Sequence, residues 1–350
     1  MIAMVKRRTL FAALGPALAA AGAAPVSSRS GSPPRKVIIG TAMQAFWVPY
    51  PGLRSRLDEL TAIIDRMAEA SQRRYGRGLD LAVLPETAIT GEAGLDALAR
   101  SVPFAGLVSE TFARAARRHR CYIVVPSYFR EADDAQRCAN AAVLVNRLGD
   151  AVGTYRKVHL VVSGDGKTME GGSSPGRQHP VFACDFGKVG IQICYDMEFD
   201  GGWRELARQG AEIIAWPTQS PQTAQPAARA AEQRCYIVSS TWRHNASVFE
   251  PTGKIAAQIR TPEQILVQEL DLSYAILPWS SKIRNGQALQ KLFGDRIGFR
   301  YYEDEDCGIF WSNDAKTPVR QMIQSLGVLE AEEELARVRD AYRRAGVADN

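Results

Sequence analysis

The sequence predicts an α/β fold in which helices alternate with the strands of mixed β-sheets. From Lys36 onward, short apolar runs of strand length alternate with segments in which apolar residues recur at helical spacing. Several of the short runs are apolar throughout, which is typical of strands covered on both faces of their sheet. Neighbouring runs joined by tight turns, such as Leu148-Gly149-Asp150, indicate hairpins and therefore some antiparallel pairing.

The first half of this pattern opens with a strand at residues 36–44. A helical pattern of apolar residues then runs from Leu53 to Met67. A buried strand at residues 79–84 stops directly before Pro85-Glu86. The elements expected next are a helix at residues 110–119, a strand at 121–128, and a hairpin of strands at 140–146 and 151–155.

The second half repeats the alternation, and the pattern changes after residue 277. Residues 280–320 are rich in loops and aromatic side chains, and residues 327–345 form a charged amphipathic helix. Between residues 181 and 270 we expect helices near residues 203–208 and at 224–234, and strands at 181–184, 189–194, 212–216, 236–241, 247–249, 255–259 and 265–270.

The N-terminus has the composition of an export signal. Lys6-Arg7-Arg8 precede a short run rich in Ala and Leu, and Ala21-Gly22-Ala23 fits a small-residue cleavage site. The arginine pair resembles a twin-arginine signal, which indicates export to the periplasm or the exterior after folding. The alternatives are a membrane anchor, for which the run is too short, and a tail on a cytoplasmic protein. The expected segments are an export signal (1–24), a Ser/Pro-rich linker (25–35), the principal domain (36–277) and a C-terminal extension ending in a helix (278–350).

Composition and charge exclude several classes of protein. A chain of 350 residues, of which 46% are hydrophobic and 23% charged, is typical of a globular protein that needs no disulfide or metal for stability. Removing Lys6, Arg7 and Arg8 from the net charge of +5 leaves +2, so no nucleic-acid partner is expected. The six cysteines are irregularly spaced, which indicates neither a disulfide framework nor a metal site. One disulfide bond among them is kept as an alternative.

Three strand ends carry side chains suited to nucleophilic catalysis. Glu86, Lys157 and Cys194 each follow a predicted strand, and strand ends of α/β sheets hold side chains beside a cleft formed by loops. Glu86 can accept a thiol proton, and Lys157 can stabilise a thiolate and an oxyanion. Each residue also has an ordinary interpretation, as a turn residue, a solvated charge or a buried core cysteine, and spacing alone does not decide between the two.

Three segments, LAVLPETAITGE, GTYRKVHL and GIQICYDMEF, occur in this order and together resemble the signature blocks of the nitrilase superfamily, the carbon–nitrogen hydrolases. The resemblance covers roughly residues 36–275. It implies that Glu86 is the general base, Lys157 the oxyanion stabiliser and Cys194 the nucleophile. Glu170, before a Pro-Gly turn, matches a second glutamate that orients the lysine and holds the substrate nitrogen, with an exposed loop acid as the alternative.

The resemblance also implies an α-β-β-α sandwich of the carbon–nitrogen hydrolase kind that associates through helices into a homodimer or a higher homo-oligomer. The implied reaction is thiol attack on the carbon of a C–N bond, followed by hydrolysis of an acyl-enzyme. It needs no metal or cofactor. The expected partners are a small-molecule amide and water, with no membrane span in the mature chain.

Residues after the nucleophile narrow the substrate class. Tyr195-Asp196 resembles the amidase and carbamoylase branches, because nitrile-cleaving members typically have Trp-Glu there. Glu198 stands where many amidase-like members have arginine, so it disfavours a carboxylate-bearing substrate if it faces the pocket. The alternative is that it turns away to pair with Arg204 or Arg229.

The end of the following strand supplies further candidates for substrate binding. Trp216 and Thr218 are expected to line the pocket together with Tyr195 and Glu198, and core packing is the alternative for the two aromatic residues. We therefore expect a hydrolase that cleaves a non-peptide C–N bond of a small amide or N-carbamoyl compound. The alternatives are nitrile hydrolysis, N-acyl transfer on the same scaffold, or a catalytically silent binding domain.

Overall fold

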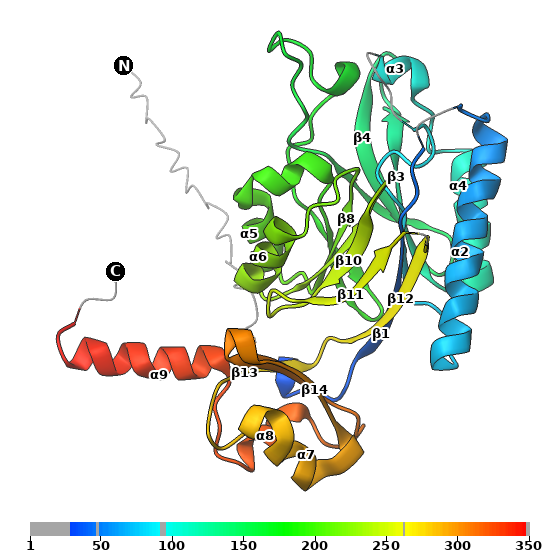
Figure 1. The fold of residues 1–350 in the computed structure, drawn as a ribbon. Helices are drawn as coiled ribbons and strands as arrows, with labels where there is room; N and C mark the ends of the chain where they lie inside the picture. Colours follow the sequence, from blue (N-terminus) through cyan, green and yellow to red (C-terminus); the bar gives the residue numbers. More distant parts are fainter. Residues whose placement is uncertain (1–28, 47–48, 92–95, 262, 348–350) are drawn as a thin grey trace, which may run out of the picture.

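Two six-stranded sheets stack face to face and form the centre of the protein (Figure 1). The computed structural model describes residues 29–46, 49–91, 96–261 and 263–347. The first sheet has the strand order β12 (Ile265–Asp271), β1 (Lys36–Ala42), β2 (Leu81–Val83), β3 (Tyr122–Arg130), β4 (Cys138–Val145) and β5 (Ala151–Arg156). The second has the order β11 (Ile255–Arg260), β10 (Asn245–Phe249), β9 (Tyr236–Ser240), β8 (Ile213–Pro217), β7 (Gly187–Ile191) and β6 (Val181–Cys184).

Both sheets are mixed, as the hairpin turns predicted. The neighbours β1, β2 and β3 are parallel, and so are β7, β8 and β9, whereas the outer strands pair antiparallel. Leu81 and Val83 of β2 share one buried core with Ile191 of β7 and Ile213 of β8, so the inner faces of the two sheets pack together. The central strands are apolar on both faces, because helices cover the outer face of each sheet.

Four helices form the outer layers. Buried apolar residues of α2 (Leu53–Tyr75) and α4 (Leu107–His119) pack on the first sheet, and those of α5 (Asp200–Arg208) and α6 (Ala224–Gln233) pack on the second. The short α3 (Ala97–Arg100) lies beside β3. The expected α-β-β-α sandwich is thus confirmed.

The C-terminal extension contains more regular structure than its loop-rich sequence indicated. β13 (Tyr274–Pro278), β15 (Cys307–Ser312) and β14 (Ile297–Tyr302) form a third sheet, which shares a core with α7 (Gln287–Phe293) and α8 (Val319–Gln324). Most of β14 is only half-buried, so its sequence has no continuous apolar run to mark a strand. The expected terminal helix is α9 (Ala331–Arg344).

The end of the expected linker packs against the body of the protein. Ser30 is fully buried and donates its hydroxyl to Glu330 Oε1, while Arg29 Nη1 donates to the Arg234 carbonyl at 2.8 Å and to the Tyr274 hydroxyl at 3.0 Å. The expected export signal lies outside the described residues. Within the ranges that the structure covers, no helix is long and apolar enough to cross a membrane.

Candidate active site

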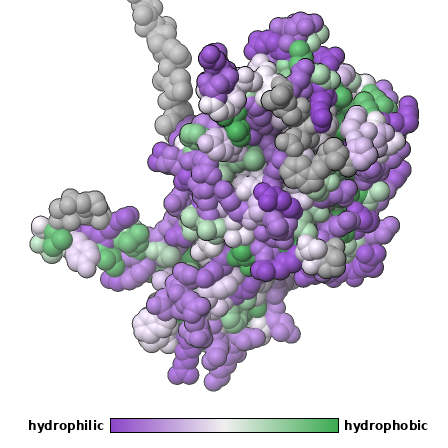
Figure 2. All heavy atoms as spheres, turned by 45° about the horizontal axis from the view of Figure 1, so that its top comes forward, coloured by the Kyte–Doolittle hydropathy of each residue, from purple (hydrophilic) through white to green (hydrophobic). Residues whose placement is uncertain are grey.

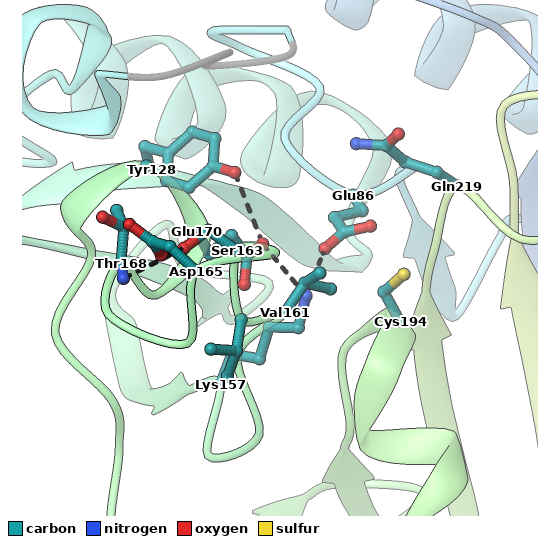
Figure 3. A pocket seen from close by; sticks show the side chains of 12 residues that line it. Glu86, Tyr128, Lys157, Val161, Ser163, Asp165, Thr168, Glu170, Cys194 and Gln219 are labelled. Carbon is teal, nitrogen blue, oxygen red and sulfur yellow. Dashed lines mark hydrogen bonds and ion pairs between the residues drawn. The ribbon is translucent and has the colours of Figure 1, made fainter.

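A cavity of about 560 Å³ opens beyond the ends of β2, β5 and β7 (Figure 3). Glu86 follows β2 by three residues, Lys157 follows β5 directly, and Cys194 follows β7 by three residues. Glu170 comes from a short 3-10 turn, Glu170–Gly172. The structure therefore brings together the four predicted catalytic residues. The described lining consists of Glu86, Tyr128, Lys157, Val161, Val162, Ser163, Asp165, Thr168, Glu170, Gly171, Cys194 and Gln219.

The ammonium of Lys157 lies between two buried carboxylates. Lys157 Nζ donates to Glu86 Oε1 and to Glu170 Oε1, each at 3.0 Å, and the lysine side chain is 1% exposed. Burial disfavours the ammonium, but the neighbouring carboxylates of Glu86 and Glu170 raise the pKa of Lys157 well above its ordinary value. Lys157 is therefore a fixed positive charge inside the cavity.

Asn140 completes a closed ring of hydrogen bonds that the sequence did not reveal. Its Nδ2 donates to Glu86 Oε1 at 2.8 Å and to Glu170 Oε1 at 2.6 Å, which are the same two oxygens that accept from Lys157. The Tyr128 hydroxyl also donates to Glu170 Oε1, at 3.3 Å. Asn140 is a polar residue in the otherwise apolar strand β4, CANAAVLV, and this break in pattern is the signal that identifies it.

The second oxygen of each glutamate is left for the cavity. Glu86 Oε2 and Glu170 Oε2 are buried and have no hydrogen-bond partner among the described residues. Burial raises the pKa of Glu170, and the neighbouring Lys157 and the hydrogen bonds from Lys157 and Asn140 oppose this shift. Both oxygens can accept a proton or an N–H group from a molecule bound in the cavity, because a buried acceptor without a partner is costly.

Cys194 sits at a sharp turn between β7 and the 3-10 turn Cys194–Glu198. Its φ angle is 42°, in the left-handed region that residues other than glycine rarely adopt. Such turns hold a nucleophile clear of the sheet. The Trp216 indole donates to the Cys194 carbonyl at 3.1 Å, and the buried Asp196 accepts from the Ile193 N–H at 2.9 Å and from the Tyr155 hydroxyl at 2.6 Å.

The thiol of Cys194 lies beside Glu86 and is protonated at rest. Burial and the negative charge of Glu86 raise the pKa of Cys194 to about 12, and Lys157 and a hydrogen bond from Thr218 oppose the shift. Figure 3 shows Glu86 between the thiol and Lys157. A base is therefore needed to remove the thiol proton during attack on a substrate.

The four expected substrate-binding residues lie outside the described lining of the cavity. The turn after Cys194 directs Tyr195 to the surface, where it is 40% exposed and packs edge-on against Phe199. Glu198 is also exposed, and its Oε1 accepts from Gln222 Nε2 at 3.3 Å. Trp216 and Thr218 are fully buried and support the Cys194 turn from behind.

Neither of the arginines expected as alternatives pairs with Glu198. Arg204 pairs with Asp200 at 2.9 Å, and Arg229 pairs with Glu232 at 3.2 Å. Besides Glu86 and Glu170, the acidic residue in the described lining of the cavity is Asp165, in the loop of residues 161–168. The sequence pattern did not identify this loop as part of the cavity, because a polar stretch rich in glycine predicts only a turn.

The described residues contain no group of three His, Cys, Asp or Glu side chains that could hold a metal ion. All six cysteines are free thiols.

Comparison with known proteins identifies the family. The family described as carbon-nitrogen hydrolase matches residues 50–277, which is more than half of the chain. The chain belongs to the carbon–nitrogen hydrolases of the nitrilase superfamily. Human deaminated glutathione amidase is 30% identical, with 59% of this chain and 71% of the relative covered. Omega-amidase NIT2 of Danio rerio is 26% identical, with 57% of this chain and 79% of the relative covered.

Solved structures of carbon–nitrogen hydrolases share the fold. Nit3 of Saccharomyces cerevisiae matches 71% of this chain and 93% of its own at 20% identity, with a TM-score of 0.59. An amidase from Nesterenkonia sp. AN1 matches 67% of this chain and 90% of its own at 20% identity, with a TM-score of 0.56. A mutant of that amidase was captured with an acetamide moiety added covalently at its active-site cysteine. The family match and the amidase relatives together show that this protein is an amidase-like hydrolase.

Proposed function

We propose that this hydrolase cleaves small amides or N-carbamoyl compounds, with Cys194 as the nucleophile. The observation that carries the proposal is the placement of a half-buried thiol beside a lysine ammonium held between two carboxylates, in one cavity. A thiol, a base and a fixed positive charge are what acyl transfer through a covalent intermediate needs.

In the first half of the proposed reaction, Glu86 accepts the Cys194 proton while the sulfur attacks the carbonyl carbon of the substrate. The proton transfer accompanies the attack, since the pKa of the thiol is raised to about 12. The Lys157 ammonium stabilises the oxyanion that forms as the C=O bond becomes single. The C–N bond then breaks, Glu86 returns the proton to the nitrogen, and ammonia or an amine leaves an acyl-enzyme thioester.

In the second half, Glu86 takes a proton from water as the water oxygen attacks the thioester carbon. The C–S bond breaks, the thiolate takes the proton back, and a carboxylic acid leaves. Glu170 orients Lys157 through the 3.0 Å ion pair, and its unpaired Oε2 is placed to accept an N–H of the substrate. Both halves need the thiol, the carboxylate and the ammonium in one cavity.

The charges of the cavity favour a neutral or cationic substrate. Glu86, Glu170 and Asp165 contribute three carboxylates to the described lining, and Lys157 contributes its one cation. Asp165 stays ionised, because hydrogen bonds from Ser163 and from the Lys167 N–H lower its pKa. A substrate carboxylate in this part of the cavity would meet like charge and find no arginine to bind it. Sensitivity to substrate charge thus lies with Asp165 rather than with Glu198.

The proposal is tested by ammonia release from a panel of neutral, cationic and anionic amides, a nitrile and an N-carbamoyl compound. We expect Cys194→Ala to lower kcat by at least about a thousandfold on every substrate that the wild type cleaves. Intact-mass measurement after mixing with the best substrate is expected to show an acyl adduct on the wild type and none on the variant. Equal inactivity of both proteins across the whole panel would contradict the proposal.

Trapping the acyl-enzyme with an added amine measures how readily acyl transfer to the amine competes with hydrolysis.

Two variants test the proposed sensitivity to the charge of the substrate. Asp165→Asn is expected to raise kcat/KM for the anionic amide relative to its neutral isostere, and Glu198→Gln is the matched control without this effect.

We further propose that residues 1–24 direct export and are removed. This is supported by the arginine pair Arg7-Arg8 and the small-residue site Ala21-Gly22-Ala23. Cleavage there keeps Arg29 and Ser30, which the body binds. N-terminal sequencing of the protein from the periplasmic or secreted fraction checks this, and an intact Met1 in the cytoplasm would count against it.

A further inference from the structure

A carboxylate buried beside the active-site turn, that of Asp196, has no role in the reaction described above. Hydrophilic residues cover most of the face shown in Figure 2, where water solvates their charges, whereas Asp196 is 0% exposed. Burying a carboxylate is costly unless hydrogen bonds replace its hydration. The groups that donate to Asp196 therefore indicate what it does.

Donors from two separate segments share the oxygens of Asp196. Oδ2 accepts from the Ile193 N–H at 2.9 Å and from the Tyr155 hydroxyl at 2.6 Å. Oδ1 accepts from the backbone N–H of His159 at 2.9 Å and lies 2.9 Å from the imidazole Nδ1 of the same residue. Because a carboxylate only accepts hydrogen bonds, the proton of this last contact lies on Nδ1. Each oxygen thus has one backbone donor and one side-chain donor.

These donors flank Cys194 and Lys157 along the chain. Ile193 directly precedes Cys194. Tyr155 and His159 lie two residues before and two residues after Lys157. A cap for the turn at the thiol would need only the Ile193 N–H, whereas the other donors come from the segment that carries the lysine. The single carboxylate therefore ties the chain on both sides of the lysine to the turn that holds the thiol.

The imidazole of His159 is held in place by stacking. Its ring lies nearly parallel to that of Phe199, with 3.9 Å between the ring centroids and 8° between the planes. The ring of His179 is stacked with it as well, at 6.4 Å. His179 Nδ1 accepts from Gln192 Nε2 at 2.9 Å, since an amide nitrogen only donates. These contacts keep Nδ1 of His159 directed at the carboxylate of Asp196.

We propose that Asp196 and His159 are positioning residues that fix the thiol of the active site relative to its ammonium. Neither residue is among the described lining of the cavity, so both act through the groups that they hold. This role depends on the proposed amidase function, because that reaction needs the sulfur of Cys194 and the Nζ of Lys157 at one carbonyl group. A displacement of about 1 Å between reacting groups can lower a rate by about a hundredfold.

Three substitutions of His159 separate the effect of the donor from that of the ring. His159→Asn keeps an N–H donor close to the position of Nδ1, His159→Gln carries its donor one bond further along the side chain, and His159→Leu carries none. All three lose the imidazole ring and keep the backbone N–H that donates to Asp196. We expect His159→Leu and His159→Gln to lower kcat about 10- to 100-fold, with KM within about twofold of the wild type. His159→Asn is expected to be at least about tenfold faster than His159→Leu.

Alkylation by iodoacetamide, located by peptide mass mapping, gives a readout that does not depend on amide turnover. We expect the rate at Cys194 to fall at least about tenfold in His159→Leu and to recover in His159→Asn, since attack by the sulfur needs the base in place beside it. The half-buried thiol of Cys307, in the third sheet, is the internal control. It is expected to react at the same rate in every protein.

Asp196→Asn tests the carboxylate itself. An amide has one accepting oxygen in place of two, and its two hydrogens face N–H or O–H donors, so we expect kcat to fall at least as far as in His159→Leu. Tyr155→Phe removes one donor only, the hydroxyl at 2.6 Å, and a smaller loss of kcat is expected. Urea denaturation of each variant measures folding separately, so that kcat is compared among folded proteins.

Three results would overturn the proposal. They are equal kcat in His159→Asn and His159→Leu, a change of KM without a change of kcat, and an unchanged rate of alkylation at Cys194 in His159→Leu. Failure of the amidase function is distinguishable from all three. An amide panel that the wild type does not cleave would contradict that function, whereas the alkylation rates still test the positioning pair.

Discussion

At the scale of single residues, the two active-site glutamates are held by shared donors. Lys157 and Asn140 each donate to the same oxygen of Glu86 and the same oxygen of Glu170. This ring fixes the separation of the carboxylates and leaves their second oxygens without a partner at the cavity. Asn140 is not itself among the residues of the described lining and acts through the two glutamates, so we regard it as a positioning residue.

Replacing Asn140→Leu removes both amide hydrogen bonds at similar volume. We expect kcat to fall about 10- to 100-fold, because hydrogen bonds to charged groups contribute about 1.5–3 kcal/mol each. The acid limb of kcat/KM is also expected to move to higher pH. Hydrogen bonds to a carboxylate lower its pKa, and their loss raises further the pKa of Glu170, which burial already raises.

The matched control for this change is Tyr128→Phe. It removes only the longer 3.3 Å hydrogen bond to Glu170, so we expect a smaller shift of the acid limb in the same direction. The measurement is kcat/KM across the acid and neutral range for all three proteins. An unshifted pH profile in Asn140→Leu would show that the amide is merely part of the core.

At the scale of elements, the start of α9 is fixed by one buried carboxyl group. Glu330 is 3% exposed, caps the first turn of α9, and accepts hydrogen bonds from Ser30 and, at 3.0 Å, from Arg320 Nη1. Burial nevertheless raises the pKa of Glu330 to about 7. The N-terminal segment, α8 and α9 therefore meet at a group that titrates near neutral pH.

The raised pKa makes stability depend on pH in a definite direction. Between pH 4.5 and about 7 the folded state binds more protons at Glu330 than the unfolded state, so the free energy of unfolding rises as the pH falls through this window. We expect this contribution to be on the order of 2 kcal/mol. In Glu330→Gln it is absent.

Urea denaturation of wild type and Glu330→Gln, above and below this window, measures the effect. The difference between the two proteins isolates Glu330 from the other titrating groups. An identical pH dependence of the two free energies of unfolding would refute the assignment.

At the scale of the whole molecule, the third sheet is fastened to the sandwich by a buried ion pair. Arg300 of β14 donates from Nε at 2.9 Å and from Nη2 at 2.5 Å to Glu250 Oε2, and the Glu250 side chain, just beyond β10, is 0% exposed. The Tyr274 hydroxyl of β13 donates to the Arg234 carbonyl at 2.7 Å. Such contacts make the extension part of the principal fold rather than a tethered appendage.

Arg300→Met leaves the Glu250 carboxylate buried without its cation. We expect a loss of about 3–5 kcal/mol in the free energy of unfolding, within a single cooperative transition. The double variant Glu250→Gln/Arg300→Met is expected to recover most of this loss, since no charge is then left buried. Chemical denaturation of the three proteins checks the prediction, and a separate early transition confined to the extension would contradict it.

Much of the architecture was predictable from local patterns. Apolar runs located most of the strands of the two main sheets, and helical spacing located the four covering helices, because burial on a given face imposes a periodicity on the sequence. The extension was the exception. The half-buried strand β14, IGFRYY, places Arg300 among aromatic residues and leaves no such periodicity.

The sequence by itself determined the family. It also determined that Glu86, Lys157, Glu170 and Cys194 lie at one cavity, because each follows a strand or belongs to a motif of the family. Only the tertiary structure decided that Asn140 bridges the glutamates, that Asp165 faces the cavity and that Glu198 does not. A hydrogen bond across strands, or the direction of a side chain from a turn, depends on how distant segments meet. The local sequence pattern does not indicate which distant segments come into contact.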